Sequence, residues 1–516
     1  MPLALTPVIL GLVAIVLTIV TAVISFYKNC FSHWKKQGLN YIEPKIPFGN
    51  ATDFFLGKRN LGELFHDWYL EMKSRGWAIG GGYFCGKPIY MPVDNQLIKK
   101  IMVSDFLSFP NHGFFINEQL DPFSGHIFNM EGYKWKNLRA KLPSAFTAAK
   151  MRKNVVIMER ISRQLLTRLD EQIRLNDKSV DIKETLNRFT IDIITACAFG
   201  MDSKTLKNEN AELTQYARPF FDYQWSRTLN VLVILVPRHI LSLFKFKLFP
   251  VSTTRYFMNM FKGIKEHREK ENVKRNDLTD LLIDLCDETK DHPDFNGQGK
   301  MDPLTFNEFA SQMLVFFEAG FETSSSTQTF AMYELAANPD IQDRVREEIN
   351  RVLGKYTGEV GYDAVNEMEY LDRFVDETLR KYPIFPIIPR VCVKDYPIPD
   401  SDITIQKNNL VMVTNLGLHH DPEYYPDPMK FDPDRFTPEN KAKRPYCSYM
   451  PFGEGPRICV GKRFGLWQTK IGIVTIVKNY KITLSRKMQL PISFDKTGLI
   501  LKAKGDVWVD LEKINC

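Results

Sequence analysis

The 516-residue sequence predicts a mainly α protein with small β-sheets, set behind one N-terminal transmembrane helix. Three observations lead to this prediction: an apolar N-terminus, two short β-rich stretches, and long segments with helical periodicity. Hydrophobic residues make up 44% of the chain and charged residues 25%, which allows a large core and excludes a disordered or fibrous protein. The net charge of +7 is too dilute over this length to indicate nucleic-acid binding.

The N-terminus has the composition of a membrane anchor. The first 27 residues carry no charged side chain, and residues 8–27 are almost all apolar. Twenty helical residues span about 30 Å, the thickness of a bilayer's hydrocarbon core. The run is too long for a signal-peptide core and no basic segment precedes it, so we expect an uncleaved anchor over residues 1–28. Lys28, Lys35 and Lys36 place the rest of the chain in the cytosol by the positive-inside rule.

The remainder of the chain is expected to be a short spacer followed by one domain. Residues 29–50 are basic and contain Pro44 and Pro47, which disfavour helix and predict a stiff spacer. Residues 51–516 contain no long linker and no internal repeat, which predicts one continuous domain. The patterns predict β structure near 77–92 and 395–413, and helices over 60–74, 130–165, 180–200, 250–290, 304–338, 340–353, 367–381 and 461–479.

A second apolar segment, residues 229–249, is interrupted by Pro237-Arg238-His239 and is too short to span a membrane. Two interpretations fit it equally well. It is either a buried helix end or a loop in the membrane interface beside the anchor, with its Lys and Arg at headgroup level. The eight cysteines include no CxxC pair, which argues against a disulfide framework and favours a reducing compartment.

One cysteine lies in an unusual loop, Pro451-Phe452-Gly453-Glu454-Gly455-Pro456-Arg457-Ile458-Cys459-Val460-Gly461. Its three glycines and Pro456 favour a tight turn whose backbone can approach a flat macrocycle. The helix that follows Cys459 presents its positive end, which favours a thiolate. Phe452 can shield the sulfur, and the Arg457 guanidinium suits a carboxylate such as a haem propionate. The loop matches the FxxGxRxCxG pattern of the cytochromes P450, with Gly461 in its last position, so the chain resembles that family.

This resemblance implies the P450 fold, a helical domain with a minor β-domain, and a haem b whose iron is bound by the Cys459 thiolate. Trp135 and Arg139 resemble the family's WxxxR element, which implies that both side chains donate to a haem propionate. Arg390 and His126 lie where many P450s place further propionate partners. The Lys-Arg-Phe-Gly-Leu-Trp-Gln run from Lys462 is most similar to the insect family 6 P450s, which oxidise plant toxins and insecticides.

The helix expected over 304–338 contains Ala-Gly-Phe-Glu-Thr, which resembles the family's AGxET element above the haem. By this resemblance Gly320 leaves room for dioxygen. Thr323 supports a bent helix and a proton path, and Glu322 helps to deliver protons to the bound oxygen through water.

Two further elements resemble the family's structural motifs. Glu377 and Arg380 form an ExxR pair, and Arg435 lies in a segment similar to FxPxRF. The resemblance implies a Glu-Arg-Arg cluster that locks the cysteine loop to the core, a structural role rather than a catalytic one. His419 and His420 are adjacent in sequence, and adjacent histidines seldom converge on one ion, so we expect no further metal site there.

The implied activity is that of a haem-thiolate monooxygenase in the endoplasmic reticulum membrane, facing the cytosol. It would insert one atom of O2 into lipophilic small molecules, either xenobiotics or endogenous lipids and hormones. The chain has no dinucleotide-binding GxGxxG and no room for flavin domains, so electrons must come from a separate NADPH-cytochrome P450 reductase, with cytochrome b5 as a further donor.

Basic residues flank the two helices that carry Trp135 and follow Cys459, namely Lys134, Lys136, Lys141, Lys462 and Arg463. They predict a positive patch for an acidic flavin domain, and a merely solvated basic surface is the alternative.

Two other activities remain open at this point. A haem-thiolate isomerase or lyase would use the same fold without O2 or reductase, and a non-catalytic protein would only bind lipophilic molecules. NADPH-dependent turnover distinguishes both from a monooxygenase.

Overall fold

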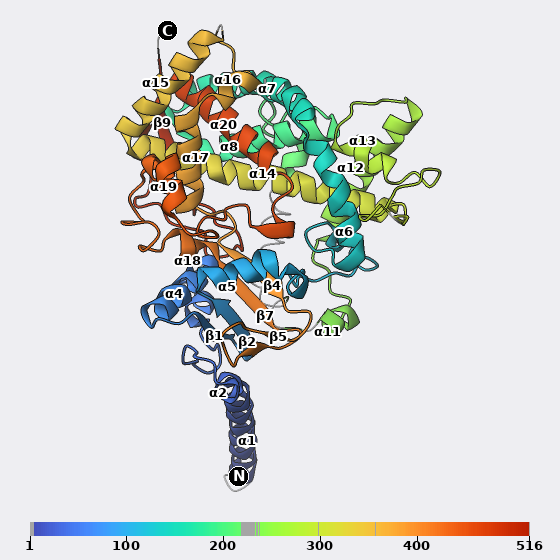
Figure 1. Cartoon of the computed structure of the whole chain (residues 1–516), viewed down its shortest axis with the longest axis vertical. Helices are drawn as coiled ribbons and strands as arrows, with labels where there is room; N and C mark the ends of the chain where they lie inside the picture. Colours follow the sequence, from blue (N-terminus) through green and yellow to red (C-terminus); the bar gives the residue numbers. More distant parts are fainter. Residues whose placement is uncertain are drawn as a thin grey trace.

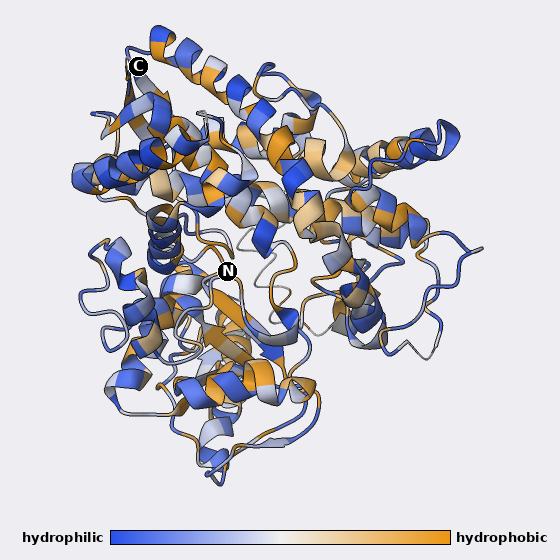
Figure 2. Ribbon diagram, turned by 45° about the horizontal axis from the view of Figure 1, so that its top comes forward, coloured by the Kyte–Doolittle hydropathy of each residue, from blue (hydrophilic) through white to orange (hydrophobic). Residues whose placement is uncertain are grey.

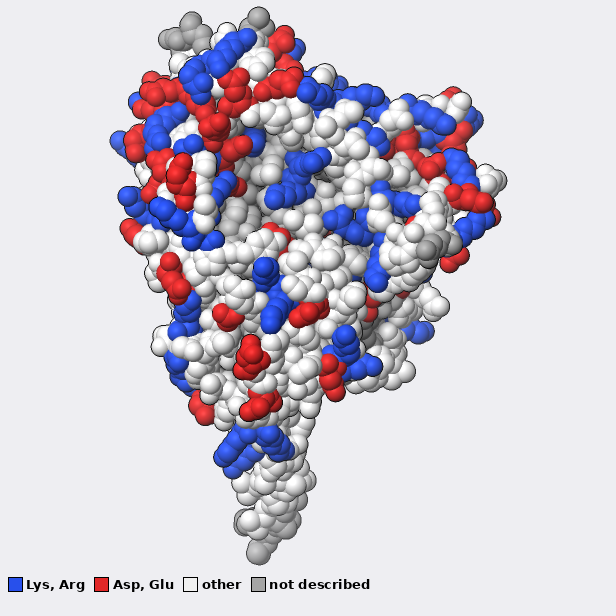
Figure 3. Space-filling model, viewed as in Figure 1, with Lys and Arg blue, Asp and Glu red and all other residues white. Residues whose placement is uncertain are grey.

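The structure is a computed structural model that describes residues 5–217, 233, 236, 238–297, 299–356 and 358–514. Helix α1, Leu5–Phe31, projects from the globule (Figure 1) and exposes a continuous set of apolar side chains from Ile9 to Phe26. It belongs to the single stretch of the described chain that is long and apolar enough to cross a membrane. Figure 3 shows this stalk without charged side chains and a basic group where it joins the globule.

The segment expected to be a spacer is instead folded onto the globule. Only Ser32 separates α1 from α2, His33–Gln37, and Trp34 in α2 is completely buried. Tyr41 bridges to Gly81 and Gly49 bridges to Phe84, so the segment lies along the edge of a β-sheet. The predicted boundary at residue 50 therefore separates two sequence compositions and not two structural units.

A four-stranded mixed sheet lies between α1 and the main body of helices (Figure 1). Its strands are β1, Ile79–Phe84, β2, Lys87–Pro92, β7, Leu410–Thr414, and β4, Ile387–Val391, in the order β1-β2-β7-β4. β2 and β7 are parallel and the other two pairs are antiparallel. The two predicted β-rich stretches supply three of these strands, whereas β4 was not predicted. Figure 2 shows hydrophobic residues along the middle of this sheet.

Smaller sheets complete the β structure. One has the order β3-β9-β8 and the other pairs β5 with β6. Their strands are β3 Ser179–Asp181, β8 Tyr480–Leu484, β9 Trp508–Lys513, β5 Tyr396–Pro397 and β6 Thr404–Ile405.

The long helix α14, Phe306–Ala337, crosses the middle of the molecule (Figure 1). Its start is fixed by a capping box in which Thr305 and Glu308 exchange hydrogen bonds with each other's backbone. It is buried on nearly every side because α8, Ile182–Ile194, and α20, Lys462–Asn479, pack against it. Its buried residues include polar side chains such as Gln312, Ser325 and Gln328, so its central position is not explained by an apolar surface alone.

Most of the predicted helices are present, but two are broken. The segment 130–165 forms α6, Gly132–Lys141, and α7, Ala148–Leu175, because Pro143 starts a 3₁₀ turn between them. The segment 250–290 forms α12, Val251–Lys270, and α13, Leu278–Asp284. The other helices are α3 Thr52–Phe55, α4 Leu61–Ser74, α5 Asn95–Lys99, α11 Arg238–Leu243, α15 Pro339–Lys355, α16 Tyr362–Asn366, α17 Glu369–Lys381, α18 Asn415–His419 and α19 Pro438–Lys443.

The apolar segment 229–249 lies partly outside the described residues. Within its described part, Leu243 at the end of α11 and Phe244 directly after it are exposed, with 78% and 79% of their surface accessible, whereas Leu248 and Phe249 are buried. The described part of the segment therefore has both exposed and buried apolar side chains. It combines a feature of the buried-helix interpretation with one of the interface-loop interpretation.

Candidate functional site

A cavity of about 280 Å³ lies between α14, the cysteine loop and β4. Ala319 is exposed although its neighbours in α14 are buried, and Cys459 is exposed although it lies deep in the fold. Both residues face this cavity, which explains their accessibility. The other lining residues that the argument below uses are His126, Trp135, Arg139, Thr323, Arg390 and Arg457.

The cysteine loop is a tight turn, as predicted. The Cys459 N–H donates to the carbonyl oxygen of Phe452 at 3.0 Å, which closes the loop on itself. Gly455 has φ +73°, and a Cβ there would lie 2.0 Å from the Met102 carbonyl oxygen, so only glycine fits. Gly461 has an ordinary φ of −89° and open space around it, and it serves as the N-cap of α20. The need for glycine at 455 thus comes from packing within the protein.

Two opposing effects act on the Cys459 thiol. Burial raises its pKa, while the Gly461 N–H and the positive charges of Arg139 and Lys462 lower it. Lys462 begins α20, so the helix dipole acts in the same direction. A metal ion bound to the sulfur would complete the deprotonation. Burial outweighs the lowering effects, so the pKa of the thiol lies above its ordinary value, and the loop places in the cavity one sulfur that a bound metal ion would convert to an anionic ligand.

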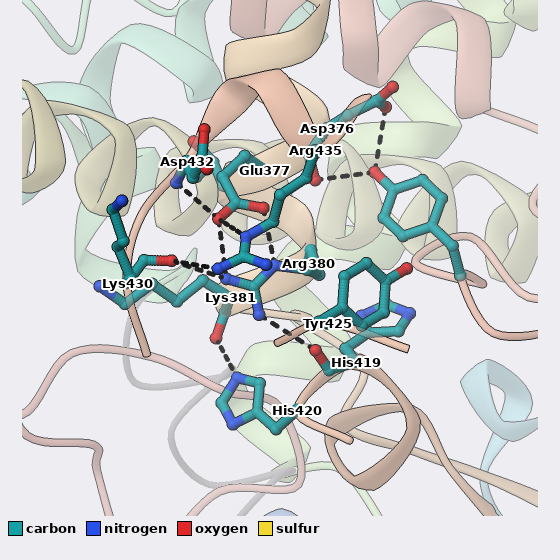
Figure 4. Close-up of polar contacts among 12 residues, drawn as sticks. Asp376, Glu377, Arg380, Lys381, His419, His420, Tyr425, Lys430, Asp432 and Arg435 are labelled. Atoms are coloured by element: carbon teal, nitrogen blue, oxygen red, sulfur yellow. Dashed lines mark hydrogen bonds and ion pairs between the residues drawn. The ribbon is translucent and has the colours of Figure 1, made fainter. Parts of the chain in front are cut away.

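A buried charge cluster supports this loop (Figure 4). Glu377 and Arg380 in α17 are both completely buried and form two hydrogen bonds, at 2.6 and 2.8 Å. Arg435 approaches the same carboxylate at 3.5 Å, and the Asp432 N–H donates to it at 2.8 Å. Burial raises the pKa of Glu377, and its hydrogen bonds and nearby cations oppose this. The Glu-Arg-Arg arrangement predicted from the sequence is confirmed.

The cluster reaches the cysteine loop through His419. Arg380 donates to the His419 carbonyl oxygen at 3.0 Å, and the ring Nε2 of His419 accepts the Met450 N–H at 2.9 Å. Burial keeps the pKa of His419 well below its ordinary value, so the ring is neutral and can accept. The adjacent His420 bonds to the Lys381 carbonyl oxygen instead. Across the described residues there is no group of three His, Cys, Asp or Glu side chains that could hold a metal ion.

Three arginines line the cavity without a close ion pair, although Glu131 acts on Arg457 from beyond ion-pair distance. Among the described residues, no carboxylate lies within ion-pair distance of Arg139, Arg390 or Arg457. Arg139 donates to the Ile458 carbonyl oxygen at 3.0 Å, and Arg390 to the carbonyl oxygen of Pro389 at 2.9 Å.

Arg457 donates to four backbone carbonyl oxygens, at 2.6–3.4 Å, and its guanidinium lies 4.0 Å from the Trp135 ring. Burial lowers the pKa of both Arg390 and Arg457 to about 9. The cavity thus has a strongly positive wall.

Several polar atoms in this wall have no hydrogen-bond partner among the described residues. They are Nε of Arg390 and both ring nitrogens of His126, and both residues are at least 96% buried. Unpaired buried polar groups are costly, so such a set indicates a missing acceptor. The two propionates of a haem would supply carboxylates here, and Cys459 would supply the iron ligand. The residues present therefore fit a haem.

The oxygen-facing turn of α14 differs in part from the prediction. Thr323 lines the cavity, and its hydroxyl donates to the Ala319 carbonyl oxygen at 2.6 Å. A Cβ on Gly320 would lie 2.6 Å from Ile194 in α8, so this glycine allows close helix packing. Ala319 is the small residue that faces the cavity next to Thr323, and the sequence argument missed it. Glu322 is buried and is absent from the cavity lining.

Comparison with known proteins agrees with this geometry. The family Cytochrome P450 matches residues 54–509. The chain is 36% identical to "Probable cytochrome P450 6a14" of Drosophila melanogaster, with 97% of this chain and 99% of that protein covered. It is 34% identical to "Cytochrome P450 6A1" of Musca domestica and to "Cytochrome P450 6k1" of Blattella germanica, with 94–95% of each chain covered.

The chain therefore belongs to the cytochrome P450 family, whose enzymes are haem-thiolate monooxygenases. Its relatives are insect family 6 enzymes, as the cysteine-loop region indicated. The cofactor is haem, bound through a cysteine thiolate, and Cys459 is the matching cysteine of the P450 pattern.

Proposed function

We propose that this P450 monooxygenase oxidises lipophilic small molecules, with electrons supplied by NADPH-cytochrome P450 reductase. The observation that carries the proposal is the Cys459 thiol, which faces a cavity with an unpaired cationic wall and a central buried helix. When bound, haem supplies the activation of O2. Cys459 would bind it through its sulfur, and Trp135, Arg139, Arg390 and Arg457 would hold its carboxylates.

The substrate class follows from the remaining cavity surface, which is largely apolar. Phe128, Phe316, Phe385, Ile388 and Ile500 lie on it, so binding would be driven by burial of apolar surface. A lipophilic plant toxin or insecticide suits such a lining and the insect family 6 resemblance. Endogenous lipids and hormones suit the lining equally well.

Thr323 is proposed to pass protons to bound oxygen. Its hydroxyl lies on the cavity and now donates to Ala319, so a small rotation would turn the donor toward the cavity. Glu322 is one residue away and would act through water. Thr323→Ala should leave haem content and ligand binding intact while more of the NADPH consumed yields peroxide. Peroxide and product yields per NADPH measure this, and unchanged coupling would contradict the role of both residues.

The protein is proposed to reside in the endoplasmic reticulum membrane, with α1 as its anchor and the catalytic domain, residues 51–516, in the cytosol. The exposed apolar surface of α1 and the basic residues Lys28, Lys35 and Lys36 support this arrangement. The exposed Leu243 and Phe244, at and directly after the end of α11, favour a second contact with the membrane interface.

The reductase is proposed to dock near the start of α20. Lys462 and Arg463 are exposed there, and Lys150 and Lys153 line a second cavity together with Gly461. Lys134 is less available, because it pairs with Glu308 at 2.7 Å. Lys136 and Lys141 add to the positive charge on and around α6. Cytochrome b5, the further electron donor, would use the same charges.

The proposed function is tested by spectroscopy and turnover together. Cys459→Ser should abolish the reduced carbon monoxide band that marks thiolate ligation, because only a soft anionic sulfur gives that electronic structure. Survival of the band would contradict the assignment of the ligand. Turnover of a lipophilic panel should require both NADPH and reductase; NADPH-independent product would favour an isomerase or lyase, and binding without product would favour a carrier protein.

A further inference from the structure

Trp34 fixes the segment between α1 and the catalytic domain to the four-stranded sheet. Its side chain is completely buried. Its indole Nε1–H donates to the Gly82 carbonyl oxygen at 3.2 Å, and its backbone N–H donates to the Tyr83 hydroxyl at 3.2 Å. The same hydroxyl donates to the carbonyl oxygen of Phe31, the last residue of α1, at 3.0 Å. One tyrosine therefore holds both sides of the turn at Ser32.

The strand β1 is shaped to receive this indole. A Cβ on Gly81 would lie 2.5 Å from a ring carbon of Trp34. A Cβ on the next residue, Gly82, would lie 2.3 Å from the Trp68 ring. Successive residues of a strand point to opposite faces, so the two glycines make room for two different tryptophans. Gly81 serves the segment that follows the anchor, and Gly82 serves α4 within the domain.

Backbone and ring contacts extend the attachment on both sides of Trp34. The Ile42 N–H donates to the Gly81 carbonyl oxygen at 3.0 Å, and the Gly81 N–H donates to the Asn40 carbonyl oxygen at 2.8 Å. The Phe31 and Tyr83 rings lie 4.9 Å apart, and those of Trp34 and Tyr90 lie 4.6 Å apart. These contacts leave α1 and the sheet without a flexible linker between them.

We propose that the anchor helix and the catalytic domain form one rigid body, with Trp34 as the joint that sets the tilt of the domain relative to the bilayer. This inference rests on the proposed insertion of α1 into a membrane. A chain with a free spacer would sample many tilts. Here the Trp34 indole is buried against Gly81 and donates one hydrogen bond, and the Trp34 backbone N–H donates a second, so the segment is held in one orientation.

The test uses the full-length, haem-loaded protein in oriented lipid bilayers, with variants Trp34→Ala and Gly81→Ala. Gly82→Ala is the matched control, because it introduces the same methyl group in the same strand but against Trp68. Linear dichroism gives the tilt of the haem plane, and amide hydrogen exchange over residues 38–42 reports on the attachment. The wild type and Gly82→Ala should show one narrow tilt. Trp34→Ala and Gly81→Ala should broaden it and speed exchange by about tenfold or more.

Three results would overturn the proposal: a broad tilt in the wild type, an unchanged tilt in Trp34→Ala, or the same broadening in Gly82→Ala. If Gly81→Ala does not fold, Tyr83→Phe takes its place in the test, because it removes the hydroxyl that joins Phe31 to Trp34. Carbonate extraction tests the anchor separately. Release of the wild-type protein by carbonate would contradict membrane insertion, while the exchange measurement would still decide whether Trp34 holds the segment.

Discussion

Two arginine clusters contact the cysteine loop or belong to it, and they differ in how their charges are balanced. Arg380 and Arg435 surround the Glu377 carboxylate. Backbone groups form further hydrogen bonds with Arg380 and with the carboxylate (Figure 4). Arg390 and Arg457, on the cavity side, have no carboxylate at ion-pair distance among the described residues. Each cluster contains one fully buried arginine, Arg380 or Arg390, and one partly buried arginine, Arg435 or Arg457, so their difference cannot be attributed to exposure to solvent.

This difference distinguishes a structural cluster from a binding cluster. A buried cation is costly unless an anion and hydrogen bonds offset the loss of solvation. The Glu377 cluster obtains both from the chain and is complete without any ligand. The Arg390 cluster obtains hydrogen bonds but no anion, so its charge is balanced only when a ligand with carboxylates binds. The resemblance to the P450 motifs already implied these two roles, and the structure supplies the physical reason for the difference between them.

The largest expected effect comes from breaking the complete cluster. Glu377→Gln leaves Arg380 and Arg435 buried without an anion, and it should cost about 3–5 kcal/mol of stability. The apparent midpoint of thermal unfolding and the haem content of the purified protein measure the loss. Glu369→Gln in the same helix is the control, because Glu369 is largely exposed and its pair with Arg373 is worth under about 1 kcal/mol. Equal effects of the two variants would contradict the structural role of Glu377.

Removing an arginine from the cavity wall should have the opposite effect on the stability of the haem-free protein. Arg390→Leu removes a buried cation that lacks an anionic partner, so the haem-free protein should be at least as stable as the wild type. Haem retention should fall by roughly 10–100-fold, as for other supporting residues of metal sites. The rate of haem transfer to an acceptor protein measures this loss, and Arg390→Lys should restore part of it. Unfolding of the haem-free Arg390→Leu protein would show that Arg390 is instead a structural residue.

Exposed cations provide the third case and the smallest effect on the enzyme itself. Changing Lys462 and Arg463 to Glu should leave thermal stability within about 1 kcal/mol, because exposed charges contribute little to folding. Turnover supported by the reductase should slow and lose much of its salt dependence, since such charges act on the association rate. Turnover supported by peroxide needs no partner and should stay close to the wild-type rate. A parallel loss in both assays would place the docking site elsewhere.

The cysteine loop and the Glu377 cluster were predictable because most of their residues lie in short motifs of fixed spacing. Gly455 and Cys459 lie in one loop, and Glu377 and Arg380 lie one helical turn apart. Other features depend on residues distant in sequence. The packing of Gly320 against Ile194, and the exposure of Ala319 rather than Glu322 to the cavity, follow from how α14 is rotated against α8.

The joint at Trp34 is a further case. Prolines and basic residues gave residues 29–50 the composition of a spacer, and nothing local in that segment indicates that Gly81 is open to receive an indole. The break between α6 and α7 has a local signal, Pro143, which the prediction of one helix over 130–165 did not use.

The sequence by itself determined the P450 class, the iron ligand, the anchor-like N-terminus and most helices, because each rests on local composition, periodicity or a compact motif. Only the tertiary structure shows which arginines have a carboxylate at ion-pair distance and which lack one. It also decides which small residue faces the cavity and whether the anchor is attached rigidly. These properties depend on the distance between side chains far apart in the chain. Burial then fixes the energetic consequence, since an unpaired charge or an unfilled space matters only where water cannot reach it.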